Sequence, residues 1–88
     1  MSWEYEITEE AQQQLKKLGK SVAGEVKQFL ETRIKGCADP TQFGKPLRGS
    51  KHGFWRYRMR DWRILCRIEN KVMVVVVVAV GHRSTVYD

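Results

Sequence analysis

Two neighbouring segments, residues 54–60 and 62–68, alternate arginine with aromatic or aliphatic side chains. Successive side chains of a β-strand point to opposite faces, so the arginines of each segment are expected on one face of a sheet. A guanidinium stays charged and can bind phosphate oxygens through two parallel hydrogen bonds. The two segments therefore predict a basic ladder suited to a polyanion. Its arginines are Arg56, Arg58, Arg60, Arg63 and Arg67.

The excess positive charge of the chain is concentrated in the same region. Residues 45–67 contain eight basic residues and one acidic residue, whereas residues 1–36 contain six of each. A field of one sign, with aromatic residues interleaved, indicates a polyanionic partner, most simply a nucleic acid backbone. The alternative is that these arginines are merely solvated on an exposed sheet face.

The amino-terminal half predicts the elements that support this ladder. Residues 3–7 alternate apolar and acidic side chains, which is typical of a short strand with one exposed face. Thr8 is expected to cap a first helix that ends at Gly19. Ser21 is expected to cap a second helix that runs to Gly36, so that the two helices form a hairpin.

The carboxyl-terminal half predicts a loop and three strands. Residues 37–50 contain glycine and proline and are expected to form a loop. Turns are expected at residues 60–61 and 69–71, with Asn70 accepting the left-handed conformation. The valine run over residues 72–80 has no polar face, as in a central strand that is covered on both sides.

Together these elements predict a single small α+β domain over residues 1–88, in the order β-α-α-β-β-β. The helical hairpin is expected to pack on one face of a mostly antiparallel sheet. The valine run is far shorter than the ~20 residues of a membrane helix, and no signal peptide is recognised, so a cytoplasmic protein is expected. Cys37 and Cys66 fit no metal-binding spacing, so free thiols and no metal or other cofactor are expected.

Four stretches, taken in their order along the chain, carry a family likeness. They are residues 44–49 (GKPLRG), 53–58 (GFWRYR), 61–64 (DWRI) with 67–68 (RI), and 80–83 (VGHR) followed by 86–87 (VY). The sequence resembles the RelE/ParE toxin superfamily, on its RelE side. The resemblance implies a toxin of a type II toxin-antitoxin pair, which cuts messenger RNA in the ribosomal decoding site without a metal ion. It also implies a cognate antitoxin that wraps the toxin with a helix and an extended acidic or apolar segment.

The resemblance also implies catalytic positions. Metal-independent RNA cleavage uses the ribose 2′-hydroxyl as nucleophile and needs a proton acceptor, a proton donor and positive charge at the phosphorane. The charge is assigned to Arg58, Arg63 and Arg83. The base is assigned to Tyr87, whose ordinary pKa of about 10 a cluster of arginines should lower. His82 is the rival base, although next to Arg83 it should point the other way.

Four further basic residues are expected to bind messenger RNA or ribosomal RNA without reading sequence. They are Lys45, Arg48, Lys51 and Arg56. Two alternatives to the ribosome-dependent endoribonuclease stay open. One is a ParE-like inhibitor of DNA gyrase on the same fold, and the other is a non-enzymatic module that only binds RNA or the ribosome.

Overall fold

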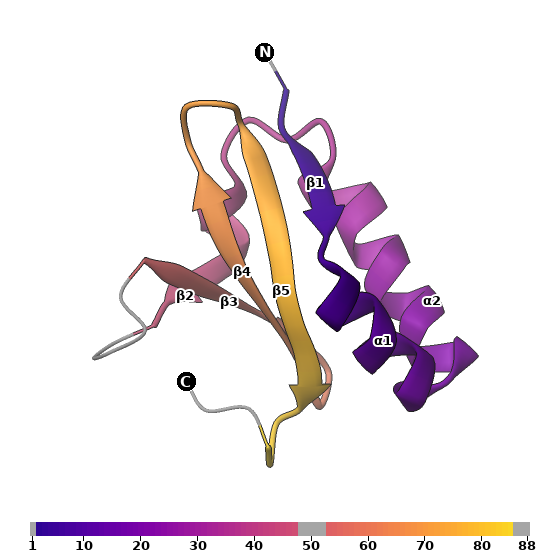
Figure 1. The fold of residues 1–88 in the computed structure, drawn as a ribbon. Coiled ribbons are helices and arrows are strands. Elements are labelled where there is room, and N and C mark those ends of the chain that lie inside the picture. The colour runs from indigo at the N-terminus through magenta and orange to yellow at the C-terminus, as the bar shows by residue number, and fades with distance from the viewer. Residues whose placement is uncertain (1, 48–52, 86–88) are drawn as a thin grey trace.

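In the computed structural model, which describes residues 2–47 and 53–85, two helices pack on one face of a five-stranded sheet (Figure 1). The strand order is β1-β5-β4-β3-β2; β1 runs parallel to β5, and the other neighbours are antiparallel. The expected α+β architecture is confirmed. The elements are β1 (Glu4–Ile7), α1 (Glu9–Leu18), α2 (Lys20–Phe29), a π-helical turn (Leu30–Ile34), a 3-10 helix (Pro40–Phe43), β2 (Gly44–Pro46), β3 (Phe54–Met59), β4 (Trp62–Glu69) and β5 (Val74–His82). No helix in the described part of the chain is long and apolar enough to cross a membrane.

The helical hairpin turns at a single glycine. Thr8 caps α1 as expected, since its Oγ1 accepts a hydrogen bond of 3.2 Å from the Ala11 N–H. Gly19 ends α1 with a φ of +100°, which a residue with a Cβ adopts only with strain. The predicted cap at Ser21 is wrong, because α2 already begins at Lys20 and has no side-chain cap. The sharp turn at Gly19 leaves no residue free between the helices for that role.

The apolar stripes of both helices cover the sheet and make the core. The helical segments contribute Ala11, Leu15, Val26, Leu30 and Ile34. The strands contribute Tyr57, Ile64, Cys66, Val75, Val77 and Val80. These strand residues share the helix-facing side, which leaves the opposite face for charged side chains.

Tyr57 fixes β3 beneath the helices. It is fully buried, its ring lies 5.5 Å from the ring of Phe29, and its hydroxyl donates a hydrogen bond of 2.9 Å to the Pro40 carbonyl. The prediction that the aromatic residues of this strand face the core is confirmed for Tyr57. Because Tyr57 points to the core, its neighbours Arg56 and Arg58 must point away from it.

The valine strand β5 is interior to the sheet but covered fully on one face only. Val75, Val77 and Val80 are buried beneath the helices, whereas the alternate positions are half-buried. The pairing with β4 skips Val78, which forms a β-bulge and shifts the alternation by one residue. The expectation of complete cover on both faces is therefore wrong, because both helices lie on the same side.

Two local details also differ from the sequence-based expectations. The expected loop contains the short edge strand β2. This strand was not predicted, because it has only three residues and two of them are a glycine and a proline. The turn between β4 and β5 extends to Met73, which has a φ of +56°, so that the left-handed residue is Met73 and not Asn70. Strand β5 consequently begins at Val74 and not at Val72.

The contact between β2 and β3 requires a glycine and can be tested directly. A Cβ at Gly44 would lie 2.5 Å from the Arg56 carbonyl oxygen and 2.7 Å from the Tyr57 ring. The substitution Gly44→Ala is therefore expected to lower the free energy of unfolding by about 1–3 kcal/mol, measured by chemical denaturation.

The matched control is Gly24→Ala in α2, where a Cβ meets open space. This control is expected to gain up to about 1 kcal/mol through helix propensity. Equal stability of the Gly44→Ala variant and the wild type would contradict the close packing of β2 on β3.

Candidate nucleic-acid interface

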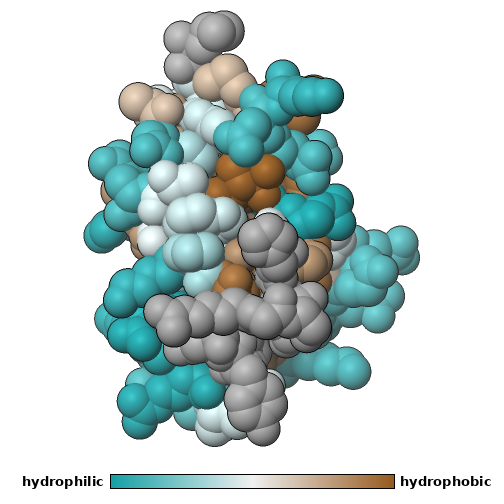
Figure 2. Space-filling model, turned by 90° about the vertical axis from the view of Figure 1, so that its left-hand side faces the viewer, coloured by the Kyte–Doolittle hydropathy of each residue, from teal (hydrophilic) through white to brown (hydrophobic). Residues whose placement is uncertain are grey.

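The sheet face opposite the helices carries a cluster of basic side chains, here called the arginine face. The strand register places Arg58 beside Arg63 on adjacent strands, and Lys45 beside Arg56 in the next row. Figure 2 views the molecule from the side away from the helices and shows hydrophilic side chains around a small hydrophobic area. The arginine face comprises Lys45, Arg56, Arg58, Arg63 and Arg83.

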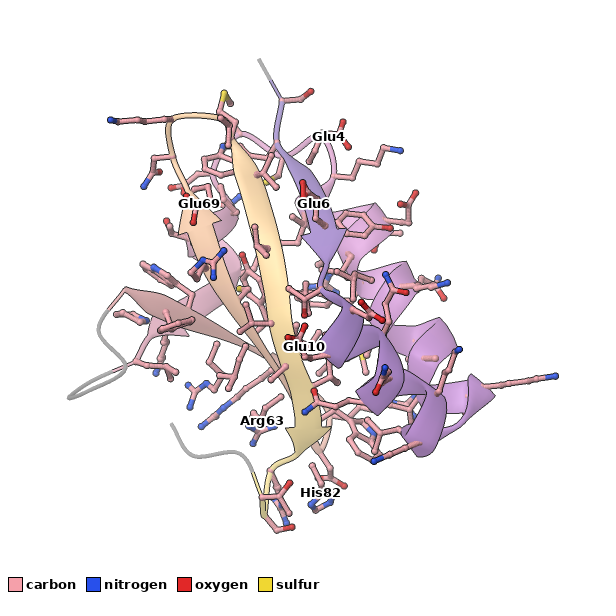
Figure 3. All side chains as sticks on the ribbon, in the orientation of Figure 1. Glu4, Glu6, Glu10, Arg63, Glu69 and His82 are labelled. Atoms are coloured by element: carbon pink, nitrogen blue, oxygen red, sulfur yellow. The ribbon has the colours of Figure 1, made fainter. Side chains whose placement is uncertain are left out.

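Arg63 is held by the backbone of the turn that precedes β4. Its Nη1 donates to the backbone carbonyls of Arg60 and Trp62, both at 3.0 Å, and the residue is only 8% exposed. On its other side the register places Gly81, which has no side chain to compete for the space. In Figure 3, Arg63 lies beside β5 on the side away from the helices. Two hydrogen bonds thus hold this guanidinium in place before any ligand binds.

Arg56 and Arg58 border a small hollow at the β2 edge of the same face. Arg56 is buried and Arg58 is exposed. Together with Phe43, Gly44 and Lys45 they line a volume of about 120 Å³. Since one water occupies about 30 Å³ in the liquid, the hollow has room for a group of a few heavy atoms, such as a phosphate. Phe43 was not predicted at this site, because β2, which follows it, was not predicted.

Arg83 lies just past β5, at the end of the arginine face. Its N–H donates to the Asp61 carbonyl at 2.7 Å, and its Nε lies 3.7 Å from the Asp61 carboxylate. The Arg83 side chain is 64% exposed, and an exposed pair of this kind contributes about 0–1 kcal/mol. The carboxylate therefore orients Arg83 only weakly, and a phosphate can replace it.

Two arginines predicted for the ladder have other partners. Arg60 has a φ of +57°, which ends the strand and turns its guanidinium toward α2, where Nη1 lies 3.2 Å from the Glu25 carboxylate. The prediction that Arg60 joins the ladder is therefore wrong. Arg67 is on the predicted face, but its Nε donates to the Glu69 carboxylate at 3.1 Å, so its charge is paired.

His82 lies away from the guanidinium groups. Its ring packs edge-on to the ring of Trp62 at 5.4 Å. Trp62 precedes Arg63 in β4, so the two side chains point to opposite faces of the sheet. The Nδ1 of His82 accepts a hydrogen bond of 3.1 Å from the Ser84 N–H. The neutral imidazole therefore carries its proton on Nε2. This geometry disfavours His82 as the base.

The remaining predicted site residues, Arg48, Lys51 and Tyr87, lie outside the described residues. Within residues 2–47 and 53–85, no group of three His, Cys, Asp or Glu side chains is placed to hold a metal ion. The described part of the site can therefore supply fixed positive charge and hydrogen-bond donors to an anionic ligand.

Comparison with known proteins agrees with this fold. Residues 5–87 match the family described as ParE toxin of type II toxin-antitoxin system, parDE. Toxin RelG of Mycobacterium tuberculosis is 30% identical over 87 residues, which cover 99% of this chain and 98% of RelG.

Solved structures show the same similarity. A chain of the RelBE2 toxin-antitoxin complex of Mycobacterium tuberculosis superposes with a TM-score of 0.85 and 28% identity, over 96% of this chain and 94% of that one. A variant of the E. coli toxin RelE in the free state gives a TM-score of 0.63 and 25% identity, over 93% and 84%. The chain therefore belongs to the ParE toxin family of type II toxin-antitoxin systems, within the RelE/ParE superfamily.

Proposed function

We propose that this toxin is a ribosome-dependent endoribonuclease, which cleaves messenger RNA in the A site without a metal ion and so inhibits translation. The observation that carries the proposal is the row in which Arg58 lies beside Arg63 on the face free of helices, with Arg83 at its end. Similarity to RelG and to the RelE variant supports the RelE side of the superfamily. Such an activity places the toxin in the cytoplasm with the ribosomes.

The proposed reaction needs positive charge at one phosphate. The 2′-hydroxyl loses its proton and attacks the adjacent phosphorus, and the bond from phosphorus to the 5′-oxygen breaks. The products are a 2′,3′-cyclic phosphate and a 5′-hydroxyl, which takes up a proton. Negative charge builds up on the phosphorane oxygens, where Arg58, Arg63 and Arg83 are assigned to bind. Because two carbonyls already hold Arg63, little reorganisation is needed, and one such contact typically contributes about 3 kcal/mol to transition-state binding.

The proton acceptor is the tyrosine at position 87 in this proposal. Arginine cannot serve as a base in proteins, and His82 packs on the other side of the sheet. The other two tyrosines are unsuitable. Burial raises the pKa of Tyr57, and a hydrogen bond of 2.5 Å to the Glu31 carboxylate, together with burial, raises the pKa of Tyr5 to about 12.

The remaining basic residues are assigned to RNA binding. Lys45 and Arg56 line the small hollow, and Arg48 and Lys51 lie between them in the sequence. Contacts of this kind depend on phosphate charge and not on base sequence. Since the RelBE2 relative is a toxin-antitoxin complex, we assign a cognate antitoxin to this toxin as well.

A second candidate function is inhibition of DNA gyrase. The specific observation in its favour is that the matching family description names the ParE toxin. An inhibitor of this kind would act by binding a protein and would not use the guanidinium row for phosphoryl chemistry. A DNA supercoiling assay run beside a translation assay separates the two functions.

The guanidinium row is tested by alanine substitution at Arg58 and Arg63. Primer extension on a reporter message, with purified ribosomes, is expected to show cleavage at least ~100-fold slower in each variant, because each removes a donor to the phosphorane. Arg67→Ala is the matched control, since Arg67 is paired with Glu69 on the same strand, and should stay within about twofold of the wild type.

Two outcomes would contradict the assignment. One is equal cleavage by the wild type and a folded Arg63→Ala variant, with folding checked by the melting temperature. The other is a wild-type toxin that leaves the message intact and inhibits supercoiling.

The proposed base is tested by titration of the tyrosines. Because the pKa values of Tyr5 and Tyr57 are raised, only Tyr87 is expected to ionise in the folded protein at or below about pH 10, and its ultraviolet tyrosinate signal should disappear in Tyr87→Phe. The raised values also mean that the unfolded chain loses these protons first, so stability should fall as the pH rises above about 10. An unchanged titration in Tyr87→Phe would refute this assignment.

A further inference from the structure

Strand β5 is longer than the strand that covers one of its edges. β1 pairs with it over Val74–Val77, and the Thr8 N–H bonds the Val77 carbonyl at 3.0 Å where β1 gives way to α1. β5 continues to His82, and Figure 1 shows α1 beside this second half, past the end of β1. Among the described residues, no strand therefore bonds the backbone groups on this edge of residues 78–82.

A glutamine of α1 takes the place of the missing strand. The Gln14 Oε1 accepts a hydrogen bond of 2.8 Å from the Val80 N–H. Hydrogen bonds of an antiparallel pair fall on alternate residues, and the Arg83 N–H donates to the Asp61 carbonyl on the β4 side. By this alternation Gly81 also faces β4, and Val80 faces the open edge. Because Val80 is buried, water would replace the Gln14 oxygen poorly.

The segment that Gln14 holds leads directly to Arg83. The β-bulge at Val78 interrupts the ladder just before Val80, so the end of β5 is attached less regularly than its start. The Arg83 side chain is 64% exposed, and its ion pair with Asp61 orients it only weakly. The position of this guanidinium consequently depends on where the backbone of residues 80–83 lies.

We infer that Gln14 is a positioning residue for the arginine face: through the Val80 N–H it holds the end of β5 so that Arg83 reaches the scissile phosphate. The inference rests on the proposed function, in which Arg83 binds the phosphorane. It goes further by assigning a role in cleavage to a residue of the helix layer, on the other side of the sheet. Since Gln14 acts on the geometry of the site, its loss should slow the chemical step and leave ribosome binding unchanged.

The test replaces Gln14 by Met, which has a similar length and only a weakly accepting sulfur. With ribosomes carrying a message, Gln14→Met is expected to lower the kcat of cleavage at least ~10-fold and to keep KM within about twofold, because a small misplacement of a catalytic group is costly. Gln14→Glu keeps an acceptor oxygen and should restore kcat to within about threefold of the wild type.

Gln12→Met is the matched control. The Gln12 side chain also makes a hydrogen bond from α1 to a strand, but its partner is the Ile7 carbonyl of β1, at 3.1 Å. Its kcat and KM are expected to stay within about twofold of the wild type. Wild-type kcat in Gln14→Met, or an equally slow Gln12→Met, would overturn the inference.

A double-mutant cycle assigns the effect to Arg83. If Gln14 acts through that side chain, Gln14→Met should slow cleavage less than about twofold in an Arg83→Ala background, because the group that it positions is already gone. An equal loss of rate in both backgrounds would mean that Gln14 acts on stability alone and would overturn the inference.

Hydrogen exchange gives a readout that does not depend on cleavage. In Gln14→Met the amides of Val80 and Arg83 are expected to exchange at least ~10-fold faster than in the wild type, whereas Gln12→Met should leave both unchanged. Unchanged exchange at Arg83 in Gln14→Met would contradict the positioning role. If the wild type cuts no message and the Arg83 amide still exchanges faster in Gln14→Met, the proposed nuclease function fails and the role of Gln14 in holding Arg83 stands.

Discussion

The alternation of side chains along β3 and β4 is the constraint on which the rest of the structure depends. Tyr57 and Ile64 point under the helices, and this forces Arg58 and Arg63 together on the opposite face. Like charges directly opposite each other on adjacent strands are destabilising. An anionic ligand bound between the two guanidinium groups would lower any repulsion between them. Because both helices cover the same side of the sheet, the opposite side stays open for the arginine face.

The backbone around Arg63 determines where its guanidinium group lies. The left-handed turn at Arg60 directs its own carbonyl to the Arg63 guanidinium and its own side chain to Glu25 on α2. Gly81 leaves the neighbouring position on β5 open. The geometry of the arginine face therefore depends on the turn at Arg60 and on the glycine at position 81 as well as on the arginines themselves.

Much of the fold could be predicted from the sequence, because periodicity is a local property. The period of two along β3 and β4 indicated which face carries charge, and Thr8 and Gly19 indicated the bounds of α1. The direction of Arg60 could not be predicted, since a positive φ at a residue with a Cβ has no sequence signal. The edge strand β2 could not be predicted either, because three residues are too few to show a period of two. Without β2, the small hollow that Gly44 and Lys45 line could not be predicted.

We propose that the arginine face binds the scissile phosphate. The most direct test is the structure of the toxin on a ribosome whose message carries a 2′-O-methyl group at the cleavage site, which blocks the nucleophile. The guanidinium groups of Arg58 and Arg63 are expected to lie within hydrogen-bond distance of that phosphate, with the Tyr87 hydroxyl next to the 2′-oxygen. A message bound along the helices, or a phosphate out of reach of both guanidinium groups, would contradict it.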